Sequence, residues 1–286
     1  MKGLATKWEQ VPEVEPEQPR TAKQSESKRT SQVDGLIKIA AGWEFFHTPD
    51  HRTYACVPVN GHAEIIAVRS RQFRAFLKRT YHKNNSKSAS SAAIEEALDF
   101  FEGEALCGQQ LVVHTRLARH GEAVYLDLCN EAWEAVEITA KHWRVVSNPP
   151  VKFRRARGML ALPTPTRGGS IKDLRPFVNV ANEDDFVLIV SHPLAALRPN
   201  LPCPILVLHG EQGSAKSTTA KVEKKLIDPA EPLLRSLPRD SRDLYIAASN
   251  SWVVALDNVS GLPTWLSDDL CRLATGGGFC HTGIVQ

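Results

Sequence analysis

The sequence predicts a protein of mixed class, in which a small α+β domain precedes an α/β domain with a parallel sheet and flanking helices. Before residue 165, helical spacing of apolar residues alternates with short hairpin patterns, which is typical of an α+β domain. After it, Pro204–His209 is a continuous apolar run, as expected for a strand buried on both faces of a parallel sheet. A second run of buried-strand type, Ser251–Asp257, ends in an acidic residue.

Length and composition limit the classes of protein that fit this chain. Its 286 residues allow one large or two modest domains. A net charge of only +3 means that nucleic-acid binding would have to come from local patches. The six cysteines contain no C-x-x-C pair, so the sequence indicates neither a zinc site nor a disulfide framework.

No targeting or membrane segment is evident. The N-terminus has no apolar core behind a basic start, which argues against a signal peptide. The longest apolar stretch, Phe186–Val190, is far shorter than the roughly 20 residues of a membrane helix. We therefore expect a cytoplasmic protein with no membrane partner.

Changes in composition divide the chain into three regions. Residues 1–32 are rich in Glu, Gln, Lys, Pro, Ser and Thr, and we expect them to be a disordered tail. Residues 33–165 form the small α+β domain, with a nucleic-acid-binding or accessory role. Residues 166–286 form the α/β domain, and the boundary falls in the Pro- and Gly-rich run at residues 162–169.

The small domain has clear element signals. A short helix is predicted near residues 36–41, and then two strands, Thr53–Val59 and Ala63–Val68, around the hairpin dipeptide Asn60-Gly61. Two helices follow, Ser70–His82 and one that carries Ile94, Leu98 and Phe101 on one face. A second hairpin, Leu111–Leu117 with Ala123–Leu128, and a strand over residues 133–138 complete it.

The loop after the first apolar run carries the strongest functional signal. Gly210–Ser217 matches the phosphate-binding P-loop pattern G-x-x-x-x-G-K-[ST], except that Ala215 replaces the second glycine. Glycines let successive backbone N–H groups point at an anion, Lys216 adds a charge for the β and γ phosphates, and the following helix adds its positive end. The predicted nucleotide-binding residues are Gly210, Glu211, Gln212, Gly213, Ser214, Ala215, Lys216, Ser217 and Thr218.

Asp257 supplies the matching acidic element. An acidic residue at the end of a buried strand has the form of a Walker B element, which would hold Mg²⁺ together with Ser217. The alternative is a turn residue that forms an Asx turn with Asn258, and the pairing with the P-loop favours the metal role. Asn258 stands where many ATPases carry a water-activating Glu, so no catalytic base is assigned.

The chain resembles prophage and mobile-element ATP-binding proteins, which are similar to the superfamily 3 helicase or primase-helicase group of P-loop ATPases. The resemblance rests on His209–Thr219, Ser251–Ser260 and the segment from Leu262 to Gly278, and extends more weakly over residues 33–279. It implies ATP and Mg²⁺ as ligands, DNA as a partner and ring-shaped homo-oligomers of full-length relatives. Lys216, Ser217 and Asp257 fall on the nucleotide and metal positions of the family.

The resemblance also implies parts that the sequence after Phe279 does not supply, namely a further core strand with a sensor residue and an arginine finger. We therefore expect an incomplete P-loop NTPase, a truncated or frameshifted product that binds ATP but is impaired in hydrolysis. A sheet that lacks strands would also expose an apolar edge, which favours aggregation.

A basic helix in the small domain keeps a second function open. Its charges include no acidic residue, so it could lie along a nucleic-acid backbone; the alternative is a solvated helix face over a core. The chain would then be a nucleic-acid-binding module with a vestigial P-loop, and a third possibility is an inactive pseudogene product. The candidate nucleic-acid contacts are Arg69, Arg71, Arg74, Lys78 and Arg79.

Overall fold

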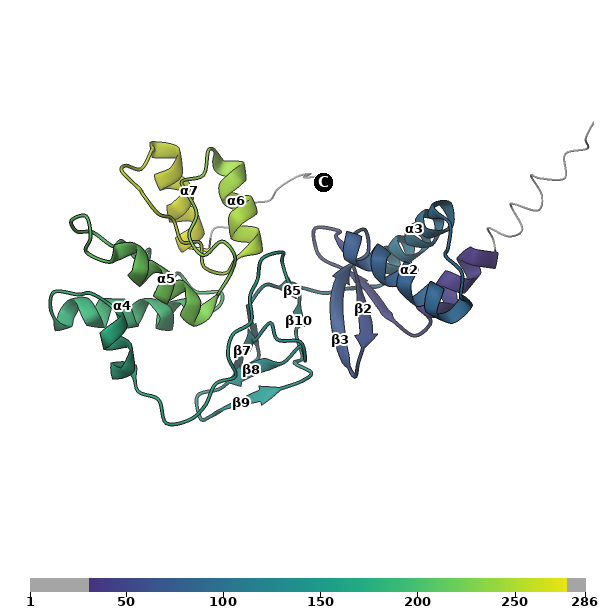
Figure 1. Cartoon of the computed structure of the whole chain (residues 1–286), viewed down its shortest axis with the longest axis horizontal. Coiled ribbons are helices and arrows are strands. Elements are labelled where there is room, and N and C mark those ends of the chain that lie inside the picture. Colours follow the sequence, from purple (N-terminus) through teal and green to yellow (C-terminus); the bar gives the residue numbers. More distant parts are fainter. Residues whose placement is uncertain (1–30, 277–286) are drawn as a thin grey trace, which may run out of the picture.

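A computed structural model describes residues 31–276, and Figure 1 shows three parts in chain order. The strands and helices of residues 44–110 come first, the central short strands of residues 113–153 follow, and the helices of residues 183–274 come last. The predicted disordered tail lies outside the described residues except for Ser31 and Gln32, which are helical, so its limit was placed too late. The helix over residues 31–39 is ordered because Val33 and Leu36 pack into the first core, while the Gln32 side chain accepts a hydrogen bond from Ser90 N at 3.0 Å.

The first sheet has the strand order β3-β2-β1-β4. The predicted hairpin is confirmed: β2 and β3 pair in antiparallel fashion around Asn60 and Gly61, whose φ values of 47° and 88° suit a two-residue turn. The bounds are β1 (Glu44–His47), β2 (Thr53–Val59), β3 (His62–Ala67) and β4 (Gln109–Gln110).

Two helices, α2 (Arg71–Asn85) and α3 (Ser91–Cys107), pack on this sheet and confirm the two predicted helices. Serine caps both N-termini, because the side chains of Ser70 and Ser90 accept hydrogen bonds from backbone N–H groups three residues later. The buried residues of α2 recur every four positions, so one face of the helix is apolar and the opposite face is free to carry charge. These buried residues are Phe73, Leu77 and Tyr81.

The central strands β6–β9 form an antiparallel meander in chain order. The second predicted hairpin is formed by β6 and β7 alone, because Val113 and His114 leave it and pair in parallel with β10. Arg116 ends the run between them, since its φ of 66° is incompatible with a continuous strand. The bounds are β5 (Val113–His114), β6 (Leu117–His120), β7 (Ala123–Asp127), β8 (Ala135–Ile138), β9 (Trp143–Val146) and β10 (Lys152–Phe153).

The last part is helical, and the helix predicted to follow the P-loop is confirmed, since it begins at Lys216. Asn182 and Asp240 cap their helices by accepting hydrogen bonds from Asp185 N and Asp243 N, both at 2.8 Å. The elements are the 3₁₀ helix η1 (Ile171–Phe177) and the α-helices α4 (Glu183–Ala196), α5 (Lys216–Ile227), α6 (Ser241–Asn250) and α7 (Thr264–Ala274).

The two strands expected beside the P-loop are not formed within residues 31–276. Pro204–His209 joins no ladder, and Ile205 and Val207 are 50% and 75% exposed rather than buried. The second apolar run, Ser251–Asp257, makes only one parallel bridge among residues 31–276, from Leu256 to Arg235. A strand persists only where a neighbouring strand satisfies its backbone groups, and within the same residues neither run is part of a sheet.

A buried network of charges joins the central strands to the helical part. Arg116 and Asp228 are both 0% exposed, and Arg116 Nε donates a hydrogen bond to Asp228 Oδ1 at 3.0 Å. The other guanidinium nitrogens donate to the carbonyl oxygens of Asp127, Leu160 and Pro229 at 3.0, 2.9 and 3.1 Å. This many partners is what makes a fully buried arginine tolerable.

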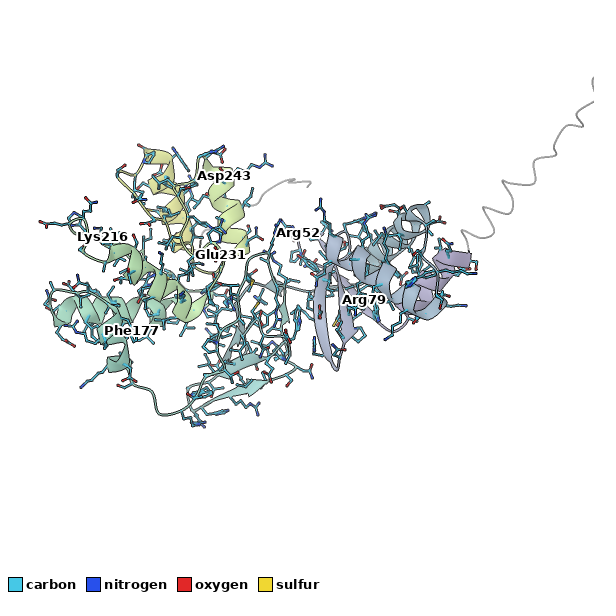
Figure 2. All side chains as sticks on the ribbon, in the orientation of Figure 1. Arg52, Arg79, Phe177, Lys216, Glu231 and Asp243 are labelled. Atoms are coloured by element: carbon cyan, nitrogen blue, oxygen red, sulfur yellow. The ribbon has the colours of Figure 1, made fainter. Side chains whose placement is uncertain are left out.

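Residues 158–160 cross residues 229–231 beside this network, in the region that Figure 2 labels with Glu231. Glu231 N donates to Gly158 O at 2.8 Å, and Leu160 N donates to Pro229 O at 3.0 Å. Gly158 has a φ of 90°, and a Cβ there would lie 2.5 Å from Glu231 O, so only glycine fits. Residues 158–160 precede the predicted domain boundary at 162–169. Through this crossing they are nevertheless attached to the helical part.

Candidate functional site

In the loop that leads into α5, the backbone adopts the tightly turned conformations that let a ligand approach it closely. Gly210 and Gly213 have φ values of 152° and 83°, in the region that glycine favours. A Cβ on Gly210 would lie 2.9 Å from Ser214 Oγ, so the space inside the loop depends on the missing side chain. Ala215 has φ 62° and ψ 20°, a left-handed conformation, which explains why the P-loop pattern asks for glycine at this position.

Lys216 lies folded over the loop. Its Nζ donates to Gly210 O at 2.8 Å, to Glu211 O at 2.6 Å and to Ser214 Oγ at 3.2 Å. The ammonium group is thus held at the centre of Gly210–Lys216, where it would meet a phosphate bound in the loop. Figure 2 labels Lys216 at the N-terminal end of α5.

The start of α5 adds backbone donors to the same place. The first N–H groups of a helix have no intrahelical partner, and no side-chain hydrogen bond caps α5 at Ala215. These groups and the positive end of the helix dipole favour an anion. The remaining predicted nucleotide-binding residues of the loop, Glu211, Gln212 and Thr218, are exposed.

Ser217 and Asp257 meet although 40 residues separate them. Ser217 Oγ donates a hydrogen bond to Asp257 Oδ1 at 2.9 Å, and the same oxygen accepts one from Asn258 N at 3.0 Å. The structure therefore brings together the hydroxyl and the carboxylate that the sequence pairs as Mg²⁺ ligands. A hydroxyl and a carboxylate oxygen are the hard donors that Mg²⁺ prefers.

Asp228 fixes the segment that carries Asp257, and sequence reasoning missed it. Its Oδ2 accepts hydrogen bonds from Trp252 N at 2.8 Å and Val253 N at 3.0 Å, and from Lys224 Nζ at 3.2 Å. Lys224 Nζ also donates to Val253 O at 2.6 Å. Burial lowers the pKa of Lys224, although the nearby Asp228 carboxylate opposes this shift. The only signal in the sequence is the i,i+4 spacing of Lys224 and Asp228, which is common on helices.

An open hollow of about 460 Å³ borders Asp257. The hollow is open to solvent, and Asp257 is the one member of the candidate site that lines it. Arg235 contributes to its wall and is held beside Asp257 by the backbone, since Asp257 N donates to Arg235 O at 2.9 Å. The lining residues are Leu234, Arg235, Ser236, Leu237, Asp257 and Asn258.

The five basic residues predicted to contact nucleic acid divide into two groups. Arg69 forms ion pairs with Asp99 and Glu102 of α3, and Arg74 forms one with Glu95. The sequence prediction considered only the charges of the basic helix itself and missed these acidic partners. Arg71, Lys78 and Arg79 are exposed.

The described residues 31–276 contain no helix that is long and apolar enough to cross a membrane, and no cluster of three or more metal-ligating side chains.

Part of the chain is similar to a replication protein of a mobile element. Residues 171–284, which include the loop, Ser217 and Asp257, match the family model of an actinomycete integrative conjugative element replication protein. The match covers less than half of the chain and does not reach the strands of the first two parts. No curated protein and no solved structure matches the chain.

Proposed function

We propose that residues 210–217 bind the phosphates of a nucleoside triphosphate, ATP by resemblance, and that Ser217 and Asp257 hold its Mg²⁺. The observation that carries the proposal is the hydrogen bond of 2.9 Å between Ser217 Oγ and Asp257 Oδ1. Two residues far apart in sequence meet next to the phosphate loop, and a hydroxyl and a carboxylate are the oxygen ligands that a phosphate-bound metal ion would need. The chain would act as the nucleotide-binding, helicase-like part of a replication protein of a mobile element.

The residues present fit this ligand. Lys216 is positioned over the loop, no side chain caps the N-terminus of α5, and the tight turn at Gly210 leaves no space for a Cβ beside Ser214 Oγ. Bound Mg²⁺ would offset the charge of the phosphates. The proposal is limited to binding, because Asn258 carries an amide that cannot accept a proton as a general base would.

Thermal unfolding of the full chain with and without Mg-ATP tests the proposal. At a nucleotide concentration 100 times Kd, binding stabilises the folded state by about 2.7 kcal/mol, which would raise Tm by several degrees. Lys216→Ala should abolish the rise. Asp257→Asn should remove the difference between Mg-ATP and ATP with EDTA.

Lys221→Ala is the matched control, because Lys221 is an exposed lysine on the same helix and, within residues 31–276, forms no hydrogen bond or ion pair with the loop. It should keep the full shift. Absence of a shift at millimolar Mg-ATP, or an equal shift in Lys216→Ala, would contradict nucleotide binding at this loop.

A further inference from the structure

Helix α2 presents a basic face that α3 does not neutralise. At about 100° per residue, the five exposed basic residues of α2 fall within about 140° of its circumference, on the side away from Phe73, Leu77 and Tyr81. Within residues 31–276, none of the five forms an ion pair. They are Arg71, Lys78, Arg79, His82 and Lys83.

The charges of α2 and α3 are separated by sign. The acidic side chains of α3 that face α2 are Glu95, Asp99 and Glu102, and they engage Arg69 and Arg74 at the edge of the pair. These contacts raise the pKa of Arg69 and lower the pKa of Glu95. A face that serves only solubility usually mixes both signs, whereas every charged residue that α2 itself contributes to this face is positive. From the first sheet, the carboxylate of Glu64 on β3 reaches this face and accepts a hydrogen bond from Gln72 at 3.5 Å.

We propose that this basic face of α2, centred on Arg71, Lys78 and Arg79, binds the phosphate backbone of DNA. Arg71 and Arg79 are eight residues apart, about 12 Å along the helix, which exceeds the size of one phosphate group and suits a polyanion. The match of residues 171–284 to a replication protein favours a nucleic acid over an acidic protein. The contact is to the backbone and carries no sequence preference of its own.

This surface is separate from the proposed nucleotide site. Figure 2 shows Arg79 in the part that contains α2 and α3, and Lys216 in the helical part at the other end of the long axis. DNA binding by α2 therefore stands or falls independently of ATP binding. The two proposals can be tested on the same protein with different readouts.

The test measures binding of the full chain to labelled duplex and single-stranded DNA of mixed sequence by fluorescence anisotropy over a range of salt concentrations. Replacing Arg71, Lys78 and Arg79 by Gln should weaken binding and reduce the slope of log K against log salt by about 3, roughly one unit for each lost phosphate contact. The ratio of duplex to single-strand affinities identifies which form of DNA is preferred. Tm and the Mg-ATP shift should be unchanged, because the three side chains are exposed.

The control variant replaces Lys221, Lys225 and Arg242 by Gln, which removes the same number of exposed positive charges from α5 and α6. It should keep the salt slope. A second control, R74Q with E95Q, removes the ion pairs of Glu95 with Arg74 and Arg69 at constant net charge and should also bind normally. The proposal would be overturned if the two triple variants lost DNA affinity equally. It would also be overturned if the unmodified chain did not bind DNA. The proposal would also be overturned if sedimentation showed that the three substitutions abolish self-association of the chain while DNA binding stays intact.

Discussion

At the scale of single residues, Ala215 replaces the second glycine of the usual P-loop pattern. This replacement has a measurable cost in conformational free energy. Its left-handed conformation places Cβ close to the following carbonyl, which costs about 1–2 kcal/mol for a residue other than glycine. The sequence alone identified the departure but could not show whether the backbone had adjusted to avoid it. The φ of 62° shows that the loop keeps the conformation that glycine prefers.

Replacing Ala215 with glycine should therefore stabilise the chain. We expect a gain of about 0.5–1 kcal/mol in the free energy of unfolding, because relief of the left-handed strain exceeds the greater entropy of glycine in the unfolded chain. Urea-induced unfolding followed by circular dichroism measures it. Ala220→Gly, inside α5, should instead destabilise by about 1 kcal/mol. Destabilisation by Ala215→Gly would contradict the conformation described here.

At the scale of elements, the sequence predicted those that local signals specify and missed those that depend on distant partners. The hairpin at Asn60-Gly61 and the helix at Lys216 follow from turn chemistry and apolar spacing, and both are confirmed. Pro204–His209 was predicted as a buried strand from its composition, but a strand also requires a partner, which composition does not encode.

The candidate site divides in the same way. The P-loop pattern and the acidic end of the Ser251–Asp257 run predicted the residues that meet, Ser217 and Asp257. The buried support was not predictable, because Arg116 and Asp228 lie 112 residues apart and neither belongs to a motif. Exposed arginines and a buried one look the same in a sequence, and only the fold distinguishes them.

Asp228→Asn should destabilise the protein by about 3–5 kcal/mol, since an amide leaves the buried cations Arg116 and Lys224 without their counter-charge. Chemical unfolding measures the change. The matched control is Glu122→Gln, which removes a carboxylate whose side chain is 98% exposed near Arg119 and should cost less than about 1 kcal/mol. Equal effects of the two substitutions would show that the network does not stabilise the fold.

At the scale of the whole molecule, the apolar surface is concentrated on the helical part. Single exposed apolar residues are ordinary, but adjacent ones favour association between molecules. The unpaired run at 204–209 is part of this apolar surface, because Ile205 and Val207 are exposed. The strongly exposed apolar residues of this part include Ile171, Phe177, Val187, Leu188, Leu194, Ile205 and Val207.

Val207→Lys should reduce self-association of the chain, because it places a charge in the middle of the unpaired apolar run, where Val207 is 75% exposed. Static light scattering over a range of protein concentrations measures it. Val112→Lys adds the same charge at a residue that is 58% exposed and outside the helical part, and should change scattering much less. Equal reductions in both variants would mean that net charge, and not this run, governs association.

The crossing of residues 158–160 over 229–231 has a consequence for how the chain can be divided. A cut within residues 162–169 would leave Gly158 and Arg116 on one polypeptide and Glu231 and Asp228 on the other. Each fragment alone would expose one member of a buried ion pair and a backbone edge shaped to fit its counterpart. The two fragments should therefore assemble when they are produced together, as in fragment complementation, and neither should fold well without the other.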